Sequence, residues 1–252
     1  MKEYKISEEF RKLTAPSSKG TQEKYCKDGY WYKINNYGEA LAEELSAKIL
    51  SCSNVKNYVD YERCMINGKP GCRSKDFLDK GEIFITFQRL YQSYVGGNLS
   101  DKIRTFSDIA ERFHYLVSFV KETTGLDCSN YLRNIFSLDL IIMNPDRHFH
   151  NLGIIQMADG SYREAPIFDN GQGLGMNYSI TPPYLEMEEK EQAIAAGTIS
   201  GSFDDQVVAA GNMLKINYEK LYDILSEYPD SPAKEFLTHR LEKYKGMFSE
   251  DI

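Results

Sequence analysis

Strand-forming and helix-forming patterns are segregated along this chain of 252 residues. Two turn signals, Asp28-Gly29 and Asn67-Gly68, stand between aromatic or apolar residues within the first 80 positions. Beyond about residue 85, apolar residues recur at three- and four-residue steps, the spacing of amphipathic helices. Segregated strands and helices are typical of an α+β architecture. The sequence therefore predicts two lobes, a small strand-rich N-lobe over residues 1–80 and a helical C-lobe over residues 81–252.

The N-lobe pattern predicts two hairpins and one helix. The first hairpin runs from Lys24 to Lys33, and residues 38–50 carry apolar side chains at helical spacing among acidic ones. The second hairpin turns at Asn67-Gly68. Its flanking strand residues are Tyr58, Val59 and Tyr61 before the turn and Phe77 and Leu78 after it.

The C-lobe pattern predicts helices interrupted by one hairpin. A helix is expected over Tyr131–Met143, and Pro145 stops it because a proline pushes the preceding residue out of helical geometry. The hairpin pairs residues 152–156 with residues 162–168 through Asp159-Gly160, and the chain is expected to be helical again from Leu185. An earlier helix is marked by one apolar stripe, formed by Phe106, Ile109, Phe113, Val117 and Val120.

Composition narrows the classes of function. No stretch approaches the roughly 20 apolar residues of a membrane span, and the first twenty residues contain no signal-peptide core. Five cysteines are scattered without a C-x-x-C pair, which indicates free thiols in a reducing compartment. The net charge of -7 argues against a broad nucleic-acid surface. We therefore expect a soluble, cytoplasmic protein that binds small molecules or proteins and neither nucleic acid nor membranes.

Polar residues with the spacing of a phosphoryl-transfer site follow the helix predicted over residues 131–143. In the segment Asn144-Pro-Asp-Arg-His-Phe-His-Asn151, Asp146 and Asn151 share the D-x4-N spacing of the protein-kinase catalytic loop. There the aspartate accepts the proton of the acceptor hydroxyl and the asparagine binds magnesium. Asp169, followed by Asn and Gly171, comes after the predicted hairpin, as the metal-binding aspartate of the kinase D-F-G motif does. This order predicts phosphoryl transfer that depends on ATP and Mg²⁺.

Each of these residues also has an ordinary structural explanation. Asp146 could cap a turn, Asn151 could hydrogen-bond within a loop, and Asp169-Asn-Gly could be a tight turn. Turns alone would seldom reproduce the ordered series of helix, D-x4-N loop, hairpin and Asp-Asn-Gly. The combination therefore favours the catalytic interpretation.

The same segments resemble the HipA-like serine/threonine kinases, the toxin kinases of bacterial toxin-antitoxin modules and their relatives. The loop of that family reads approximately N-x-D-x-H-x-x-N, which Asn144, Asp146, His148 and Asn151 match. A second match is Ser17-Ser-Lys-Gly-Thr-Gln-Glu-Lys24, which resembles the family's S-x-x-G-x-Q-x-K phosphate loop. The resemblance spans roughly residues 15–175 and implies a bilobal kinase fold that transfers phosphate from ATP to a protein.

The resemblance assigns the phosphate loop to nucleotide binding and to regulation. Gly20, Gln22 and Lys24 would cover the phosphates, and backbone N-H groups around Gly20 suit phosphate oxygens. In the family, autophosphorylation of a serine in this loop can switch activity off, and Ser17 matches that position with Ser18 beside it. A phosphate of about two negative charges there would repel bound ATP.

Lys33, at the end of the first hairpin, resembles the kinase lysine that pairs with the α- and β-phosphates. We expect Glu39, at the start of the next helix, to be its ion-pair partner, with Glu43 or Glu44 as alternatives. His148 is placed with the catalytic residues because the family's first loop histidine supports the loop geometry. We expect it to hydrogen-bond the backbone or Asp169 and not to bind zinc.

Partners and rival functions follow from the same resemblance. Full-length members carry a subdomain ahead of the phosphate loop, whereas about sixteen residues precede it here, which indicates a kinase-core form with a separately encoded antitoxin or partner. The implied substrate is a translation factor, a tRNA-charging enzyme or another protein. Asp146-Arg147-His148 resembles the D-R-H of lipid-kinase loops, so a lipid or small-molecule kinase is one alternative. A catalytically silent nucleotide-binding module is another, although the retained catalytic residues speak against it.

Overall fold

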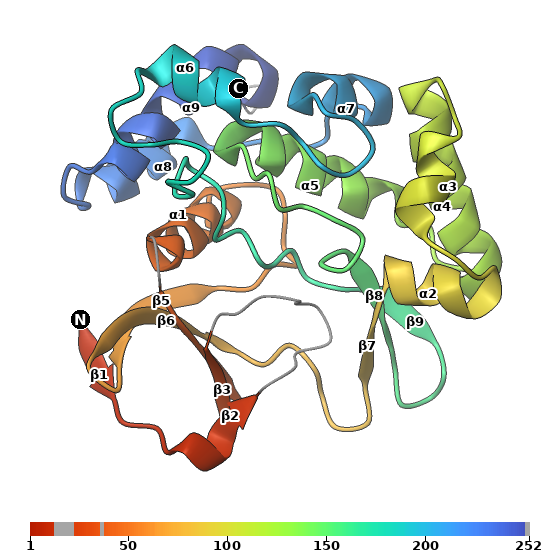
Figure 1. The fold of residues 1–252 in the computed structure, drawn as a ribbon, viewed down its shortest axis with the longest axis horizontal. Helices are drawn as coiled ribbons and strands as arrows, with labels where there is room; N and C mark the ends of the chain where they lie inside the picture. The colour runs from red at the N-terminus through yellow and green to blue at the C-terminus, as the bar shows by residue number, and fades with distance from the viewer. Residues whose placement is uncertain (13–22, 36–37, 250–252) are drawn as a thin grey trace.

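A six-stranded sheet forms the N-terminal part of the molecule (Figure 1). The computed structural model describes residues 1–12, 23–35 and 38–249. The strand order is β1-β5-β6-β4-β3-β2, in which β1 runs parallel to β5 and the other pairs are antiparallel. The strands are β1 (Lys2–Tyr4), β2 (Arg11–Lys12), β3 (Lys24–Lys27), β4 (Tyr30–Ile34), β5 (Tyr61–Ile66) and β6 (Lys69–Lys75).

Both predicted hairpins of this sheet are confirmed. The φ angles are 51° and 74° at Asp28 and Gly29, and 50° and 77° at Asn67 and Gly68. Positive φ at both central positions is type I′ turn geometry, which matches the twist of paired strands and favours Asp-Gly and Asn-Gly. The strands of the second hairpin are shorter than predicted, because β5 begins at Tyr61 and β6 ends at Lys75. The predicted strand residues that lie in the flanking loops are Tyr58, Val59, Phe77 and Leu78.

Asn67 also fixes the first segment of the chain against the sheet. Its side chain accepts a hydrogen bond from Ile6 N and donates one to Ile6 O, both at 2.8 Å. This pair holds the chain where it leaves β1, ahead of the short 3-10 helix η1 (Glu8–Phe10) and β2. The sequence patterns do not predict β1 or β2, because strands of three and two residues are too short to show alternation.

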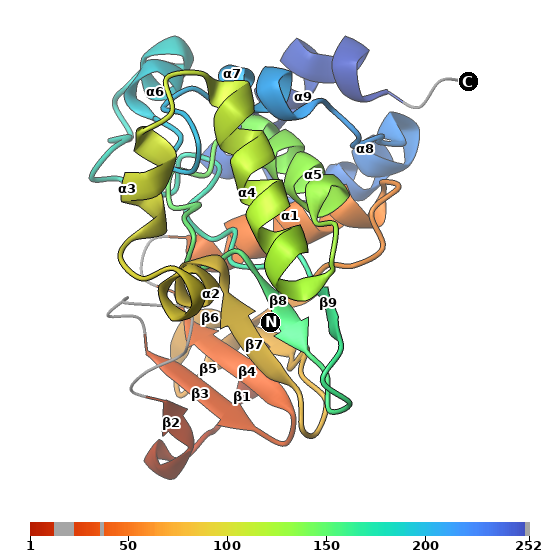
Figure 2. The same cartoon turned by 90° about the vertical axis from the view of Figure 1, so that its right-hand side faces the viewer.

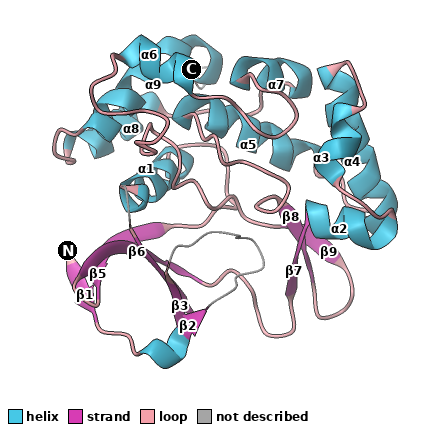
Figure 3. Ribbon diagram, viewed as in Figure 1, coloured by secondary structure: helices cyan, strands magenta, loops and turns pink. Residues whose placement is uncertain are grey.

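Helix α1 (Glu39–Ser51) confirms the helix predicted over residues 38–50. It lies between the sheet and the other helices, as Figures 1 and 3 show. Ala40 and Ala47 pack in a core cluster with residues of β5 and β6, whereas Leu45 and Ile49 belong to the main core of the helical part. Helix α1 therefore connects the two parts of the molecule.

A second, three-stranded sheet has the order β7-β8-β9, with both pairs antiparallel. It is built from β7 (Ile83–Thr86), which is not predicted, and from the predicted hairpin of β8 (Gly153–Gln156) and β9 (Tyr162–Glu164). Strand β9 ends before the predicted residue 168 because Pro166 has no N-H for a ladder. Beyond the proline, Ile167 leaves this sheet and pairs instead with the loop before β5, where Val59 N donates to Ile167 O at 2.9 Å.

The remaining helices are α2 (Phe87–Tyr94), α3 (Leu99–Arg104), α4 (Ile109–Thr124), α5 (Ser129–Ile142), α6 (Met187–Ala193), α7 (Phe203–Ala210), α8 (Tyr218–Ser226) and α9 (Pro232–Phe248). Most of them form the upper part of the molecule in Figure 2, and α2 lies lower, beside the strands. The helical character predicted from residue 185 onward is therefore confirmed. Phe106, predicted as part of the α4 stripe, lies before the helix, because Asp108 caps the helix N-terminus by accepting a hydrogen bond from Glu111 N. None of the helices in the described ranges has the length and apolar character needed to cross a membrane.

Helix α5 is the central element of the helical part, because ten of its 14 residues are buried. It confirms the prediction for residues 131–143 with a change at each end, since it begins at Ser129. The helix ends at Ile142, and Met143 adopts a left-handed φ of 49°. The chain therefore turns away two residues before Pro145 and enters the loop that carries Asp146.

Candidate active site

A cluster of three charged side chains joins the sheet, α1 and the segment after β9. The Nζ atom of Lys33 on β4 lies 2.8 Å from Glu43 Oε1 on α1 and 2.9 Å from Asp169 Oδ1. The side chains of Lys33 and Glu43 are 12% and 2% exposed, so both charges are largely removed from water. Buried charges require partners. This cluster therefore fixes three separate segments of the chain against one another.

Glu43, and not Glu39, is the partner of Lys33. The expectation for Glu39 is wrong, and the alternative of Glu43 is correct. Glu39 lies one turn earlier on α1, where its Oε1 accepts a hydrogen bond from Gln172 Nε2 at 3.2 Å. Gly171 passes so close that a Cβ atom there would lie 3.0 Å from Glu39 Cβ. Glu39 therefore packs against the segment after Asp169, and Glu43 faces the lysine.

The backbone of Asp169 adopts a left-handed φ of 62°. Non-glycine residues seldom adopt this conformation, although aspartate tolerates it better than most. Its N-H faces the hydroxyl of Tyr61 at 3.4 Å, and the next N-H, of Asn170, donates to Glu43 Oε2 at 2.8 Å. Such conformations cluster at functional sites. The turn directs the Asp169 carboxylate towards Lys33.

The pKa of Asp169 is held well below its usual range. Burial alone would raise this pKa, but the ammonium groups of Lys33 and Lys24 lower it by more. The ionised carboxylate therefore stabilises the fold above its ordinary pKa of 3.8, and this contribution is lost as the pH falls towards the folded-state value. We expect wild-type and Asp169→Asn proteins to differ more in free energy of unfolding at about pH 6 than at about pH 3. Denaturant titrations of both proteins measure this, and an equal difference at the two pH values would contradict it.

The loop of residues 144–151 is held by its own amide side chains. Asn151 Nδ2 donates to Asp146 O at 2.8 Å, and Asn151 Oδ1 accepts from His148 N at 2.9 Å. The buried Asn144 connects this loop with the next segment, because its Oδ1 accepts from Asp146 N at 3.2 Å and its Nδ2 lies 3.4 Å from Asp169 O. The structure therefore brings Asp146, Asn151 and Asp169 into one connected unit. Within it, the side chain of Asp146 is 60% exposed.

His148 does not make the contacts that we expect from the sequence. Its Nε2 lies 3.9 Å from Asp146 Oδ1, and its buried Nδ1 has no hydrogen-bond partner among the described residues. The expectation of a side-chain bond to the backbone or to Asp169 is therefore wrong, because the ring turns towards Asp146 and packs against His150, with ring centroids 5.5 Å apart.

Arg147 is buried, with 1% of its side chain exposed. Its guanidinium binds both carboxylate oxygens of Asp139 on α5, with Nε to Oδ2 at 2.9 Å and Nη2 to Oδ1 at 3.1 Å. It also donates to Phe168 O at 2.8 Å and to Asn170 Oδ1 at 2.5 Å. Arg147 is therefore a structural residue of the site, and its side chain is not available to a lipid head group.

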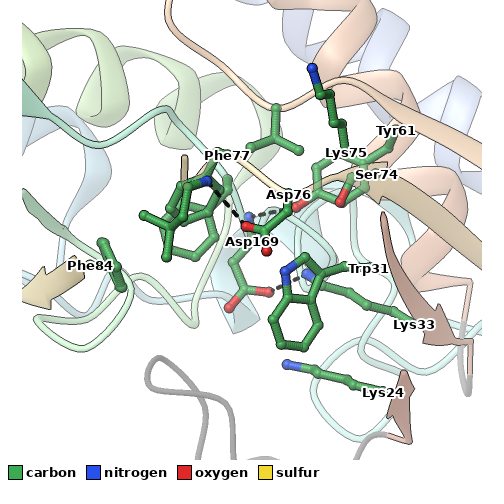
Figure 4. Close-up of a pocket in the computed structure, with 13 residues that line it drawn as sticks. Lys24, Trp31, Lys33, Tyr61, Ser74, Lys75, Asp76, Phe77, Phe84 and Asp169 are labelled. Carbon is green, nitrogen blue, oxygen red and sulfur yellow. Dashed lines mark hydrogen bonds and ion pairs between the residues drawn. The ribbon is translucent and has the colours of Figure 1, made fainter. Parts of the chain in front are cut away.

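An apolar pocket opens beside the charged cluster, as Figure 4 shows. The rings of Phe77, Phe84 and Phe168 contact one another at centroid distances of 5.3 to 5.7 Å and form part of its wall. Lys33 and Asp169 also line the pocket, so it is polar on that side. The full lining comprises Lys24, Trp31, Lys33, Val59, Tyr61, Ser74, Lys75, Asp76, Phe77, Leu78, Phe84, Phe168 and Asp169.

Lys24 is the predicted phosphate-binding residue of the phosphate loop that the structure describes. It is buried on β3 directly opposite Lys33 on β4, and both lysines line the pocket. Burial and the neighbouring Lys33 lower the pKa of Lys24, an effect that Asp169 and Glu43 partly offset. The other predicted residues of this loop, Ser17, Ser18, Gly20 and Gln22, lie outside the described residues.

The donor set fits a hard divalent cation. Mg²⁺ prefers oxygen ligands, and Asp169 and Asn151 supply a carboxylate and an amide oxygen. Among contacts between described residues, Lys33 binds Asp169 Oδ1 and leaves Oδ2 for a second partner. In the same set, Asn151 Oδ1 accepts one hydrogen bond, and a carbonyl oxygen has two lone pairs. These two residues therefore retain acceptor capacity for a metal ion.

Sequence reasoning missed most of the pocket wall. Trp31 lies on β4 and Phe84 on β7, and Phe77 lies in the loop between β6 and β7. Long-range packing therefore decides that these three side chains line the same pocket. One signal was available: the chain contains a single tryptophan, and it lies in the hairpin that ends at Lys33.

The structure thus brings together a lysine of a sheet, a glutamate of the adjacent helix and an aspartate that follows a hairpin, beside an apolar pocket. The fold matches that of a solved kinase, the proinflammatory kinase CtkA of Helicobacter pylori, with a TM-score of 0.64, 14% sequence identity and coverage of 90% of each chain. This confirms the α+β kinase-like fold that the resemblance to the HipA-like kinases implied.

A second solved structure is HipA of Shewanella oneidensis MR-1 in a complex with HipB and operator DNA. Its TM-score is 0.45 at 10% identity, with coverage of 96% of this chain and 67% of that chain. The fold assignment rests on the CtkA match. No protein-family model and no curated protein sequence matches the chain.

Proposed function

We propose that this protein is an ATP-dependent serine/threonine protein kinase of the HipA-like type. The observation that carries the proposal is the contact of Lys33 with both Glu43 and Asp169 beside the apolar pocket. Phosphoryl transfer requires little covalent chemistry from the protein, so catalysis depends on positioning and electrostatic stabilisation. A buried lysine and a carboxylate held 2.9 Å apart supply the charges for this task.

The pocket would hold the nucleotide. Its aromatic wall suits a nucleobase, since binding pockets are mostly apolar with a few placed polar groups. Lys24 and Lys33 face the same space and would contact phosphate oxygens. We assign Gly20 and Gln22 to the same phosphates on the basis of the sequence match.

The catalytic loop would act on the acceptor. Asp146 is exposed, with its backbone held by Asn144 and Asn151, so its carboxylate can accept the proton of a serine or threonine hydroxyl. Asn151 and Asp169 would hold Mg²⁺, which supplies charge neutralisation for the transferred phosphoryl group. His148 Nε2 lies 3.9 Å from Asp146 Oδ1, beyond hydrogen-bond distance, and His148 is not a proton acceptor for the substrate in this proposal.

One rival function loses its main argument. The Asp146-Arg147-His148 sequence suggested a lipid or small-molecule kinase, but the contacts of Arg147 to Asp139 and to the segment around Asp169 account for the arginine. The silent-module alternative remains a distinct outcome of the experiment below.

The experiment compares acceptors for the labelled phosphate of γ-labelled ATP with magnesium. Wild-type protein is incubated alone, with lysate proteins, and with lipid vesicles, and phosphoamino-acid analysis identifies the labelled residue. Label on serine or threonine supports the proposal. Label on lipid alone supports the rival kinase, and bound but intact ATP in every mixture supports the silent module.

Trp31 provides a direct report of nucleotide binding, because it is the one tryptophan of the chain and lines the pocket. Stacking of a base against an indole changes its fluorescence environment. We expect ATP with magnesium to quench the emission in a saturable manner. The Trp31→Phe protein should bind ATP, measured by calorimetry, without this signal. Unchanged wild-type emission at saturating ATP would contradict the placement of the base.

Regulation and partners follow from the sequence match. We expect phosphorylation of Ser17 or Ser18 to accumulate when the protein is incubated with ATP and to lower its later activity. Mass spectrometry of active and inactive fractions maps the site, and phosphate that is absent from both serines in the inactive fraction would contradict this. A separately encoded antitoxin or partner subunit belongs to the same proposal.

A further inference from the structure

We propose that the Asp139–Arg147 pair is a positioning element that sets the orientation of Asp146 and Asp169 together. The inference rests on the proposed function, because it assigns these two carboxylates to phosphoryl transfer. Asp139 and Arg147 are both buried, and neither is among the residues that line the nucleotide pocket.

One guanidinium contacts both functional segments. Arg147 directly follows Asp146, so fixing the arginine fixes the backbone next to that carboxylate. Its Nη1 donates to Phe168 O at 2.8 Å and its Nη2 donates to Asn170 Oδ1 at 2.5 Å, and these two residues flank Asp169 on either side. The relative placement of Asp146 and Asp169 is therefore tied to a single planar group.

The guanidinium is itself fixed to the most buried helix of the molecule. Asp139 on α5 is fully buried and binds Arg147 through both oxygens, at 2.9 and 3.1 Å. A bidentate arginine–carboxylate pair fixes the orientation of the two groups as well as their distance, which the point charge of a lysine cannot do. Because water does not reach the pair, no solvent molecule can replace a lost contact.

The network continues to the N-terminal sheet. Asn170, which binds Arg147 through its side chain, donates its N-H to Glu43 Oε2 at 2.8 Å. Glu43 in turn contacts Lys33 at 2.8 Å. The arginine is thus linked through Asn170 and Glu43 to the lysine assigned to the phosphates. Displacing the arginine would disturb the geometry of transfer without removing a group that binds ATP.

Arg147→Lys is the test variant, and Arg240→Lys is its matched control. Arg240 is equally buried, pairs with Glu191 at 2.6 Å and donates to Leu140 O on the same helix α5 at 2.6 Å. Within the described ranges, Arg240 makes no hydrogen bond or ion pair with the segments that carry Asp146 or Asp169. Asp139→Asn, which keeps the size of the side chain and removes its charge, is the second test variant.

The kinetic measurement compares the rate of transfer from ATP with the nucleotide affinity reported by Trp31. We expect Arg147→Lys and Asp139→Asn to lower kcat about 100-fold, because displacements near 1 Å in a transfer site cost that much. The Kd for ATP should stay within about threefold of wild type, and Arg240→Lys should leave both quantities within about threefold. The proposal is overturned if the test variants keep wild-type kcat, or if Arg240→Lys loses as much as they do.

Hydrogen exchange separates failure of this inference from failure of the proposed function. The amides of His148 and Asn170 donate to Asn151 and Glu43 and should be protected in wild type. Faster exchange at both amides in Arg147→Lys or Asp139→Asn, but not in Arg240→Lys, supports a positioning role even if wild type transfers no phosphate. Unchanged protection at both amides in folded test variants overturns it, whatever the activity.

Discussion

Replacement of Asp169 by asparagine is expected to lower the rate of phosphoryl transfer about 10³-fold while the protein stays folded. The substitution keeps the size of the side chain and removes the charge that contacts Lys33 and that would hold the metal. Single-turnover transfer from γ-labelled ATP measures the rate, and Trp31 fluorescence measures ATP binding in the same samples.

The matched control for this variant is Asp159→Asn. Asp159 lies in the loop between β8 and β9, where its carboxylate accepts hydrogen bonds from Ser161 N and Oγ at 2.9 and 2.6 Å. Asp159→Asn makes the same chemical change in the hairpin that precedes Asp169, away from Lys33, so we expect wild-type rates. A transfer rate in Asp169→Asn above about a tenth of wild type would contradict the role of Asp169.

The second large effect is a difference in kcat/KM for ATP between substitutions of two glutamates of α1, Glu43 and Glu39. Glu43→Gln is expected to lower kcat/KM for ATP about 100-fold, because it removes one of the two charges that hold Lys33 in place. Glu39→Gln is expected to change it by less than about threefold, because the glutamate that contacts Lys33 is Glu43.

Steady-state kinetics and thermal unfolding of the two variants test this prediction side by side. Unfolding temperatures show whether a lost rate reflects a lost fold. A larger loss in Glu39→Gln than in Glu43→Gln would assign the ion pair to the first turn of α1, and would contradict the contact between Lys33 and Glu43.

Local chemistry made much of this fold predictable. Asp28-Gly29 and Asn67-Gly68 specify their hairpins because each pair readily adopts positive φ, and these are the angles that the turns have. The loop around Asp146 and the segment around Asp169 are short contiguous patterns, so the sequence identified them and their order. Asn144 hydrogen-bonds to both segments, at Asp146 N and Asp169 O, which agrees with the expected catalytic unit.

The choice between Glu39 and Glu43 could not be made from spacing. The two residues are four positions apart on one helix, so they lie on the same face, about one turn apart along the helix axis. What decides between them is the close passage of Gly171 beside Glu39 and the bond from Asn170 N to Glu43, both of which depend on tertiary packing. Helical periodicity contains no information on either contact.

Arg147 shows a second limit of sequence reasoning. An arginine between Asp146 and His148 matched a loop pattern, and the pattern suggested a substrate class. Its buried partner, Asp139, lies among the apolar residues of the last turn of α5, Leu138, Leu140, Ile141 and Ile142, where a charge is costly unless it is paired. In the sequence, an aspartate at an apolar helix position with no adjacent cation was the signal that a buried cation had to lie nearby.

The most direct test of the kinase assignment is to follow the γ-phosphate of ATP by mass spectrometry and phosphorus NMR with wild-type and Asp169→Asn proteins in the presence of magnesium. The account predicts that wild type moves this phosphate to a serine or threonine hydroxyl and that Asp169→Asn binds ATP and leaves it intact. ATP that binds to wild-type protein and keeps its γ-phosphate in the presence of lysate proteins would contradict it.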